Sequence, residues 1–270
     1  MRLLATTSIR LSAFMFACLL LPAAQADQLE IIHRTGKLRV AIINGLPGFS
    51  FTQPHQGFIG SDVETARLLA REMGVKPEFV QVTNAGRIPA LKTGRADLII
   101  SALSLTPERE RDIVLSVPYA SIAVVVGAPH DYDISSYRDL RGKTVGTGRN
   151  TADGFFLRHK APAARIVEYE NEPALIEGYL RHHFEIISCQ EATLRELNSL
   201  LPHDQKMETK FVQREFQVAI GMRKNEPALH KWINQWIVRN LVDGSLNEIF
   251  QRYHGHSLPE SVLPSTSPAH

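Results

Sequence analysis

One segment in the first half of the chain combines a strand end, a hydroxyl-bearing loop, a helix start and an arginine. The apolar run Asp97–Ile100 is typical of a buried strand, and Ser104 lies in the loop behind it. Thr106 before Pro107 predicts a helix start with Thr106 as its N-cap. A helix N-terminus attracts anions, and Arg109 can direct a planar guanidinium at a carboxylate. The segment therefore predicts a carboxylate site; the alternative is that Thr106 only caps its helix and Arg109 pairs with a surface glutamate.

A second segment also leads from a strand through a glycine loop to a helix start. Gly146 and Gly148 precede Asn150 and Thr151, and Thr151 would begin the helix. The glycine spacing does not match the Gly-x-Gly-x-x-Gly dinucleotide pattern, and the sequence has no Walker motif. The loop is therefore either an ordinary turn or a second helix N-terminus that could face an anion.

Strands and helices alternate along the chain, and this order predicts how the two segments are positioned. The predicted strands cover 38–43, 77–82, 97–100, 123–126, 144–146, 185–188 and 217–221. The predicted helices cover 61–73 and 88–93, begin at 106 and at 151, and return at 229–237 and 246–253. Such alternation is typical of an α/β fold with mostly parallel sheets, in which ligands bind beyond the carboxyl ends of strands.

The first 26 residues have the features of a secretory signal peptide. Arg2 and Arg10 form a basic start, Leu11–Leu21 is an apolar run, and Ala24-Gln25-Ala26 is a small-x-small cleavage site. Cleavage would remove two of the 30 basic residues and leave 28 against 28 acidic ones. The net charge of the mature chain therefore gives no argument for nucleic acid or a membrane surface as a partner, and we expect no nucleic-acid partner. This segment therefore predicts that the protein is exported to the periplasm.

Only Cys189 would survive cleavage, and its apolar neighbours indicate a buried core residue rather than a nucleophile. One thiol forms no internal disulfide, and the sequence contains no CxxC pair for redox or zinc chemistry. We therefore expect no cofactor and no metal.

The order of motifs resembles the family 3 extracellular solute-binding proteins, the polar amino-acid type that feeds ABC importers. Gly60–Glu64 resembles the family's Gly-Phe-Asp-Val-Asp segment, and Ser104–Arg109 resembles its Ser-x-Thr-x-x-Arg stretch. Further similar segments are Ile88–Asp97, Ser116–Tyr119, Gly142–Gly146, Val218–Lys224 and Asp243–Leu246.

The resemblance implies a type II periplasmic binding protein fold with two α/β lobes, each a mixed, mostly parallel sheet flanked by helices. Two crossovers, near 122–126 and 214–220, would join the lobes. The implied boundaries are a signal peptide at 1–26, lobe 1 at 27–121 and 217–257, lobe 2 at 122–216, and a disordered tail at 258–270.

The resemblance also implies a ligand site between the lobes. Ser104 and Arg109 would hold a ligand carboxylate from lobe 1, and the backbone of Ala102 would accept from an amino group. Thr151 would reach the carboxylate from lobe 2 through its backbone N–H. Asn150 replaces a loop glycine there and tolerates a left-handed backbone better than most residues do.

Several positions depart from the family pattern. Gln190 stands where relatives have an aspartate for the ligand's ammonium, with Glu191 beside it. Leu46 and Asn84 stand where members of the family have aromatic residues. The residues that bind the ligand's carboxylate match the family pattern, whereas the residue that binds its ammonium does not. The resemblance therefore implies a carboxylate-bearing ligand. An amino acid stays open if Glu191 turns inward.

Three functions follow from the resemblance. The first is a non-catalytic, monomeric binding protein that takes an amino acid or small carboxylate to an ABC permease in the inner membrane. The second is a dehydratase-like periplasmic enzyme on the same fold, with Glu191 or the pair His182-His183 as acid/base candidates. The third is an accessory protein of a periplasmic dehydrogenase system.

Overall fold

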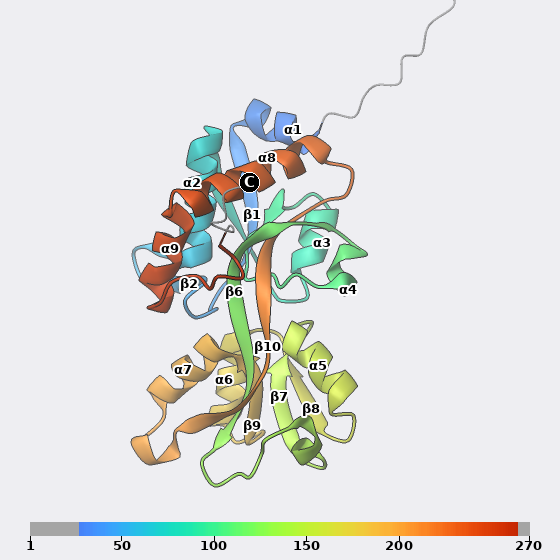
Figure 1. Cartoon of the computed structure of the whole chain (residues 1–270), viewed down its shortest axis with the longest axis vertical. Coiled ribbons are helices and arrows are strands. Elements are labelled where there is room, and N and C mark those ends of the chain that lie inside the picture. The colour runs from blue at the N-terminus through green and yellow to red at the C-terminus, as the bar shows by residue number, and fades with distance from the viewer. Residues whose placement is uncertain (1–26, 264–270) are drawn as a thin grey trace, which may run out of the picture.

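The structure, a computed structural model, describes residues 27–263 and has two lobes that two long strands connect (Figure 1). Both long strands have 16 residues: β6 covers Val114–Pro129 and β10 covers Met207–Met222. They pair antiparallel, with Ile122 opposite Phe216 where the chain passes between the lobes. The family resemblance is thus matched by a mixed α/β fold with two lobes.

Lobe 1 contains both ends of the described chain. Its strands are β1 (Lys37–Ile43), β2 (Phe51–Gln53), β3 (Gly57–Ile59), β4 (Lys76–Val82) and β5 (Leu98–Ile99). Its helices are α1 (Gln28–Thr35), α2 (Ser61–Met73), α3 (Arg87–Lys92), α4 (Pro107–Glu110), α8 (Pro227–Val242) and α9 (Ser245–His254). Trp236 of α8 and Leu69 of α2 are fully buried in its core.

Lobe 2 lies between the two long strands in the sequence. Its strands are β7 (Thr144–Gly148), β8 (Arg165–Tyr169) and β9 (Ile186–Gln190). Its helices are α5 (Ala152–Lys160), α6 (Glu172–Leu180) and α7 (Glu191–Leu200), with short 3₁₀ turns at Tyr137–Leu140 and His203–Gln205. Figure 1 shows α6 and α7 on one side of this lobe and α5 on the other.

One sheet of eight strands runs through both lobes in the order β4-β1-β5-β10-β6-β9-β7-β8. Within each lobe, the outer strands pair parallel, as β1 does with β4 and β5, and β7 with β8 and β9. The carboxyl ends of these parallel strands point from each lobe toward the other lobe (Figure 1). The loops behind β5, β7, β8 and β9 therefore all lie at the junction between the lobes.

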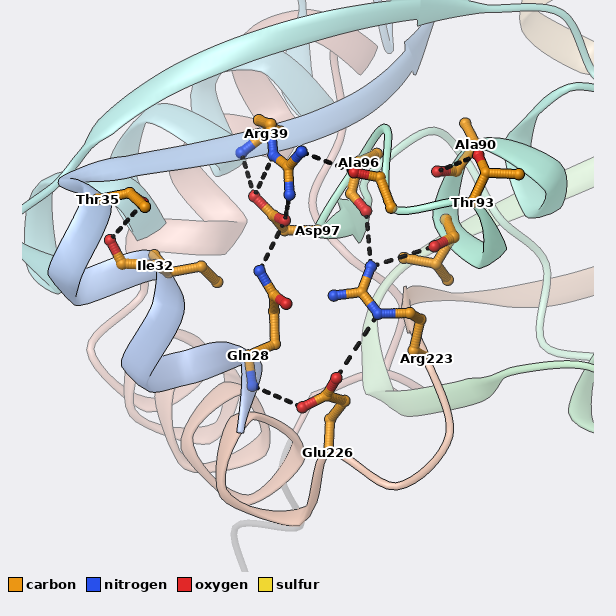
Figure 2. Close-up of polar contacts among 12 residues, drawn as sticks. Gln28, Ile32, Thr35, Arg39, Ala90, Thr93, Ala96, Asp97, Arg223 and Glu226 are labelled. Carbon is orange, nitrogen blue, oxygen red and sulfur yellow. Dashed lines mark hydrogen bonds and ion pairs between the residues drawn. The ribbon is translucent and has the colours of Figure 1, made fainter. Parts of the chain in front are cut away.

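A buried polar network fixes the end of lobe 1 that lies away from this junction (Figure 2). Asp97 is 1% exposed and accepts from Gln28 Nε2 at 2.9 Å and from Arg39 N at 2.8 Å. Arg223 donates to the carbonyl of Ala96 at 2.9 Å and lies 3.6 Å from Glu226. A buried carboxylate with this many donors is satisfied, so Asp97 has a structural role.

The segment 258–263 is a correction to the expected disordered tail. Leu258 and Val262 are 4% and 5% exposed and pack into the lobe 1 core. The Leu258 N–H donates to Asn247 at 2.8 Å, and the Ser261 carbonyl accepts from Gln217 at 2.7 Å. Proline and serine content suggested disorder, but two buried aliphatic side chains and these bonds stabilise the segment. The rest of that tail, 264–270, lies outside the described residues, as does the predicted signal peptide.

Between Asp27 and Leu263, the structure contains no helix that is both long and apolar enough to span a bilayer. The carboxylate of Asp27 caps α1 by accepting from Leu29 N at 3.0 Å, and it also accepts from Ala228 N at 2.9 Å. The first described residue is thus bonded to the start of α8.

Candidate functional site

The two segments that the sequence singles out face each other across a cavity of about 440 Å³ between the lobes. Lobe 1 contributes Thr106 and Arg109 from the start of α4, and lobe 2 contributes Asn150 and Thr151 from the start of α5. The apolar part of the wall comes from Ile88, Leu105, Pro107, Phe155, Phe156 and Phe216. A small organic molecule would touch both lobes here.

Arg109 supplies positive charge to this cavity. Its Nη1 donates to the carbonyl of Ser104 at 2.6 Å, which fixes the side chain beside the loop. Burial, and then the nearby Arg87, lower the pKa of Arg109 to about 9, so the guanidinium stays charged at neutral pH. The helix α4 has only four residues, so the attraction for an anion comes from the guanidinium more than from a helix dipole.

In lobe 2, Thr151 uses its hydroxyl to cap α5. The hydroxyl donates to the carbonyl of Gly148 at 2.7 Å and accepts from Gly154 N at 3.2 Å. Asn150 has φ 55°, the left-handed conformation that the sequence analysis expects there. The hydroxyl has therefore already used its proton, and the free donors at this end are backbone N–H groups of α5.

Asp153, in the first turn of α5, is 4% exposed and accepts from Thr147 Oγ1 at 2.9 Å. Burial raises the pKa of this carboxyl, while the hydrogen bond from the Thr147 hydroxyl and the charge of Arg109 act in the opposite direction. Asp153 therefore places a buried carboxyl group on the lobe 2 side, opposite the positive charge of lobe 1.

Ala102 and Ser104 lie in the β5–α4 loop, as the resemblance implies, and hydrogen bonds of the Ala102 N–H and the Ser104 carbonyl fix this loop. Ala102 has φ 42°, and its N–H donates to Asp62 Oδ2 at 2.7 Å. Asp62 also accepts from the Tyr119 hydroxyl at 2.6 Å, and burial raises its pKa to about 7. Ser104 is 2% exposed, and its carbonyl accepts from Arg109. Asp62 thus holds the loop that presents Arg109.

The structure does not bring Gln190 to the cavity that Arg109 lines. Gln190 ends β9 and lines a separate small cavity of about 90 Å³ together with Glu191 and His254. The side-chain oxygen of Gln190 is buried and has no hydrogen-bond partner within the described part of the chain. Glu191 pairs with Arg195 at 3.3 Å on an exposed surface.

The two histidines considered for catalysis lie at the opposite end of lobe 2. His182 and His183 line a pocket with Lys143 and Ile186, at the amino ends of β7 and β9. His183 hydrogen-bonds the Tyr169 hydroxyl at 3.1 Å. The loops that face lobe 1 follow the carboxyl ends of these strands, so the pair does not reach the interlobe cavity.

Sequence reasoning missed two buried charged residues at the junction. Arg87, 4% exposed, donates to the carbonyls of Ser101 at 2.9 Å and Asn84 at 3.3 Å, and burial lowers its pKa to about 10. Glu172, 5% exposed, accepts from Asn84 Nδ2 across the lobes at 3.4 Å. Arg87 is the first residue of α3 and Glu172 is the first residue of α6, and both helices follow the end of a strand. A charged residue at such a position is the sequence pattern that could have indicated these two residues.

Comparisons with known proteins agree with this geometry. The sequence profile of the bacterial extracellular solute-binding proteins, family 3, matches residues 38–256. The L-cystine-binding protein TcyJ of Escherichia coli strain K12 is 24% identical over 234 residues, which is 86% of this chain and 88% of that protein. The chain therefore belongs to the family 3 extracellular solute-binding proteins.

Solved structures extend the comparison. The ancestral amino acid-binding protein AncCDT-1, described as a precursor of cyclohexadienyl dehydratase, is 26% identical with a TM-score of 0.76, over 84% of this chain and 99% of that one. The cysteine-binding protein from Campylobacter jejuni has a TM-score of 0.79 at 21% identity, over 90% and 97% of the two chains, and supports the fold. The predicted two-lobed fold is confirmed.

Proposed function

We propose that this chain captures an amino acid or a related small carboxylate between its lobes and delivers it to an ABC importer. The observation that carries the proposal is the charged, partly enclosed guanidinium of Arg109, which faces the start of α5 across the interlobe cavity. A carboxylate placed there would receive charge-assisted hydrogen bonds from Arg109 and backbone N–H groups of α5.

A ligand held in this way favours the closed arrangement, because only closure makes both sets of contacts at once. The lobes already touch where Asn84 Nδ2 donates to Glu172 Oε1 at 3.4 Å. Closure removes water from the ligand, which strengthens the charged bonds. A permease could then distinguish the loaded protein by the relative position of the lobes.

Names of relatives support the transport role. The glutamine-binding protein GlnH of Bacillus subtilis strain 168, 24% identical over 85% of this chain, is described as an ABC transporter protein. We further propose that the chain acts in the periplasm after loss of residues 1–26, as a monomer whose other partner is an inner-membrane permease.

The test is binding with and without Arg109. Amino acids and small organic acids are first screened by thermal shift, because a ligand that binds the folded state raises the melting temperature. Arg109→Ala should then weaken binding of the best ligand by about 2–5 kcal/mol, since a desolvated carboxylate loses its charged partner. Isothermal titration calorimetry gives the affinity.

The matched control is Arg181→Ala, which removes an exposed arginine that pairs with Glu177 on the outer face of lobe 2. Its affinity should equal that of the wild type. Equal affinity of Arg109→Ala and wild type would contradict the proposed site, and no stabilising ligand in the screen would contradict the proposed function.

An enzyme on this fold is the second candidate. Glu172 is buried at the junction, and its burial raises the pKa of its carboxyl, so it could hold a proton for a bound substrate. The similarity to AncCDT-1 adds support. Turnover of a ligand from the screen by purified protein, followed by product analysis, separates catalysis from binding.

A further inference from the structure

Asp62 joins three elements of lobe 1 beside the proposed site. Its carboxyl is fully buried; Oδ2 accepts from the Ala102 N–H at 2.7 Å and Oδ1 accepts from the Tyr119 hydroxyl at 2.6 Å. Asp62 lies in the first turn of α2, Ala102 in the β5–α4 loop and Tyr119 in β6. In the same loop, the carbonyl of Ser104 accepts from the Arg109 guanidinium at 2.6 Å. The carboxyl of Asp62 is thus connected to Arg109 through one short loop.

The contact with Asp62 supports a strained backbone. Ala102 has φ 42°, in the left-handed region that residues other than glycine rarely adopt. Such a conformation persists only where the surrounding contacts hold it, and the hydrogen bond from the Ala102 N–H to Asp62 is one of these contacts. Asp62 is therefore a positioning residue, which acts on a ligand through the loop that it holds.

The surroundings of Asp62 accept its carboxyl with or without a proton. When Oδ1 is protonated, its O–H can donate to the Tyr119 oxygen, because a hydroxyl is both a donor and an acceptor. The distance of 2.6 Å between these two oxygens suits a hydrogen bond in either direction. Oδ2 accepts from Ala102 in both states, so protonation changes the charge of this cluster without breaking a contact that holds the loop.

Two titratable side chains from other elements act on Asp62, namely Tyr119 from β6 and Arg87 from α3. Burial raises the pKa of Asp62 to about 7, whereas the hydrogen bond from Tyr119 and the charge of Arg87 favour the ionised form. Arg87 is also buried, and the carboxyls of Glu172 and Asp153 on lobe 2 act on it in turn. The two forms of Asp62 are thus close in free energy at neutral pH, and a new charge at the junction shifts the balance between them.

A ligand carboxylate at Arg109 is such a charge. The charge of Arg87 acts on Arg109, so a carboxylate bound there also lies within reach of Arg87. It offsets part of the positive charge that favours ionised Asp62, and two carboxylates repel each other in a site without water. The ligand therefore favours protonated Asp62, and because linkage is reciprocal, protonated Asp62 favours the ligand.

We propose that ligand capture is linked to a proton on Asp62: the folded protein takes up a proton from solvent at Oδ1 when a carboxylate enters the junction. This proposal rests on the proposed function, because it adds a regulating group to the same site. Affinity should be constant where Asp62 is already protonated in the free protein. It should fall as the pH rises above that range, by at most about tenfold per pH unit for one proton.

The first test needs no ligand. The NMR chemical shift of the Ala102 amide reports the charge of the carboxyl that it contacts, so it should titrate in one step between about pH 5.5 and 8.5. Tyr119→Phe should move the midpoint upward, because the lost hydrogen bond favours the ionised form. Asp62→Asn should abolish the titration. A constant Ala102 signal in the wild type, or a midpoint that moves downward in Tyr119→Phe, would overturn the proposal.

The second test measures proton uptake during binding. The probes are L-glutamine and L-arginine, which appear in the names of two relatives, and glutarate, an acid without an amino group. For each probe that binds, calorimetry at about pH 7 in phosphate and in Tris, two buffers with different enthalpies of ionisation, gives the number of protons taken up. The wild type should take up between about 0.2 and 1 proton, and its affinity should be about threefold or more weaker at about pH 8 than at about pH 6.

Asp62→Asn imitates the protonated carboxyl, because its amide can donate to Tyr119 and accept from Ala102. It should take up no proton and should keep one affinity across this pH range, close to that of the wild type at the acidic end. The control Asp204→Asn removes an exposed carboxylate from the turn at His203–Gln205 and should keep the wild-type pH profile. A wild-type profile in Asp62→Asn would overturn the proposal.

The outcomes separate this proposal from the proposed function. Binding without proton uptake by the wild type would overturn the role of Asp62 and keep the binding function, even if no variant could be purified. Binding that Arg109→Ala abolishes, together with proton uptake that Asp62→Asn abolishes, would support both. No binding of any probe or screened acid by the wild type would remove the proposed function, and the proton linkage with it.

Discussion

Asp62 is a buried carboxylate that positions the loop carrying Arg109. Burial raises its pKa from 3.8 to about 7, against hydrogen bonds from Tyr119 and Ala102 and the charge of Arg87. Between these two values the folded state binds the proton that the unfolded state has lost. Stability attributable to this group therefore falls as pH rises toward 7, by up to about 1.4 kcal/mol per pH unit.

Asp62→Asn should flatten this dependence, because an amide has no proton to lose in that range. The measurement is urea unfolding at several pH values between 5 and 8. Asp112→Asn is the control, since Asp112 is an exposed residue whose pKa Lys92 lowers, and it should keep the wild-type slope. An unchanged slope in Asp62→Asn would show that another group titrates.

At the residue scale, sequence reasoning succeeded where local chemistry decides the outcome. Asn150 adopts the expected left-handed backbone, and Arg109 lies beside the expected loop. Arg87 and Glu172 were missed because a charged residue at a helix start is normally exposed, and their burial at the junction follows from tertiary packing. Gln190 was expected in the same site as Arg109, but it lines a different cavity. The roles of these residues in binding stay predictions.

Among the elements, α2 begins in a way that the sequence did not indicate. Ser61 and Glu64 have the spacing of a capping box with Ser61 as N-cap, but the N-cap is Gly60, and the Ser61 hydroxyl instead contacts His254 at 3.1 Å. Gly60 has φ 128°, and a Cβ there would lie 2.2 Å from the carbonyl oxygen of Phe49. Only glycine fits this backbone and this close contact.

Gly60→Ala should therefore lower the free energy of unfolding by well over about 1 kcal/mol, the size of an ordinary incompatible glycine replacement. Gly57→Ala is the matched control: its φ is 71°, but a Cβ there meets nothing within 4 Å. Chemical denaturation of both variants isolates the clash from the cost of the left-handed backbone. A similar loss of unfolding free energy in both variants would mean that small shifts relieve the contact between the new Cβ and Phe49.

The sequence pattern predicted the order of strands and helices better than their lengths. The expected strands 123–126 and 217–221 are parts of β6 and β10, which are 16 residues each. Along β10, most buried residues lie in its last third, within lobe 1, while the part near the crossover is largely exposed. Hydrophobic periodicity therefore misses the exposed crossover part of β10, whereas β6 is buried through its crossover and gives a signal there.

At the scale of the whole molecule, the two lobes were predicted from the resemblance and not from composition. One sheet with eight strands passes through both lobes, and the parallel strands of each lobe end at the shared junction. This geometry places the β5–α4 and β7–α5 loops opposite each other, although about 40 residues separate them in the sequence. The antiparallel pair of β6 and β10 is the connection about which the lobes could move apart to admit a ligand.

The most direct test of the account is a crystal structure of the protein with the amino acid that stabilises it most. We expect the ligand between the lobes, with its carboxylate within hydrogen-bonding distance of the Arg109 guanidinium and backbone N–H groups at the start of α5. A ligand bound outside the junction, or one whose carboxylate does not contact Arg109, would contradict the account.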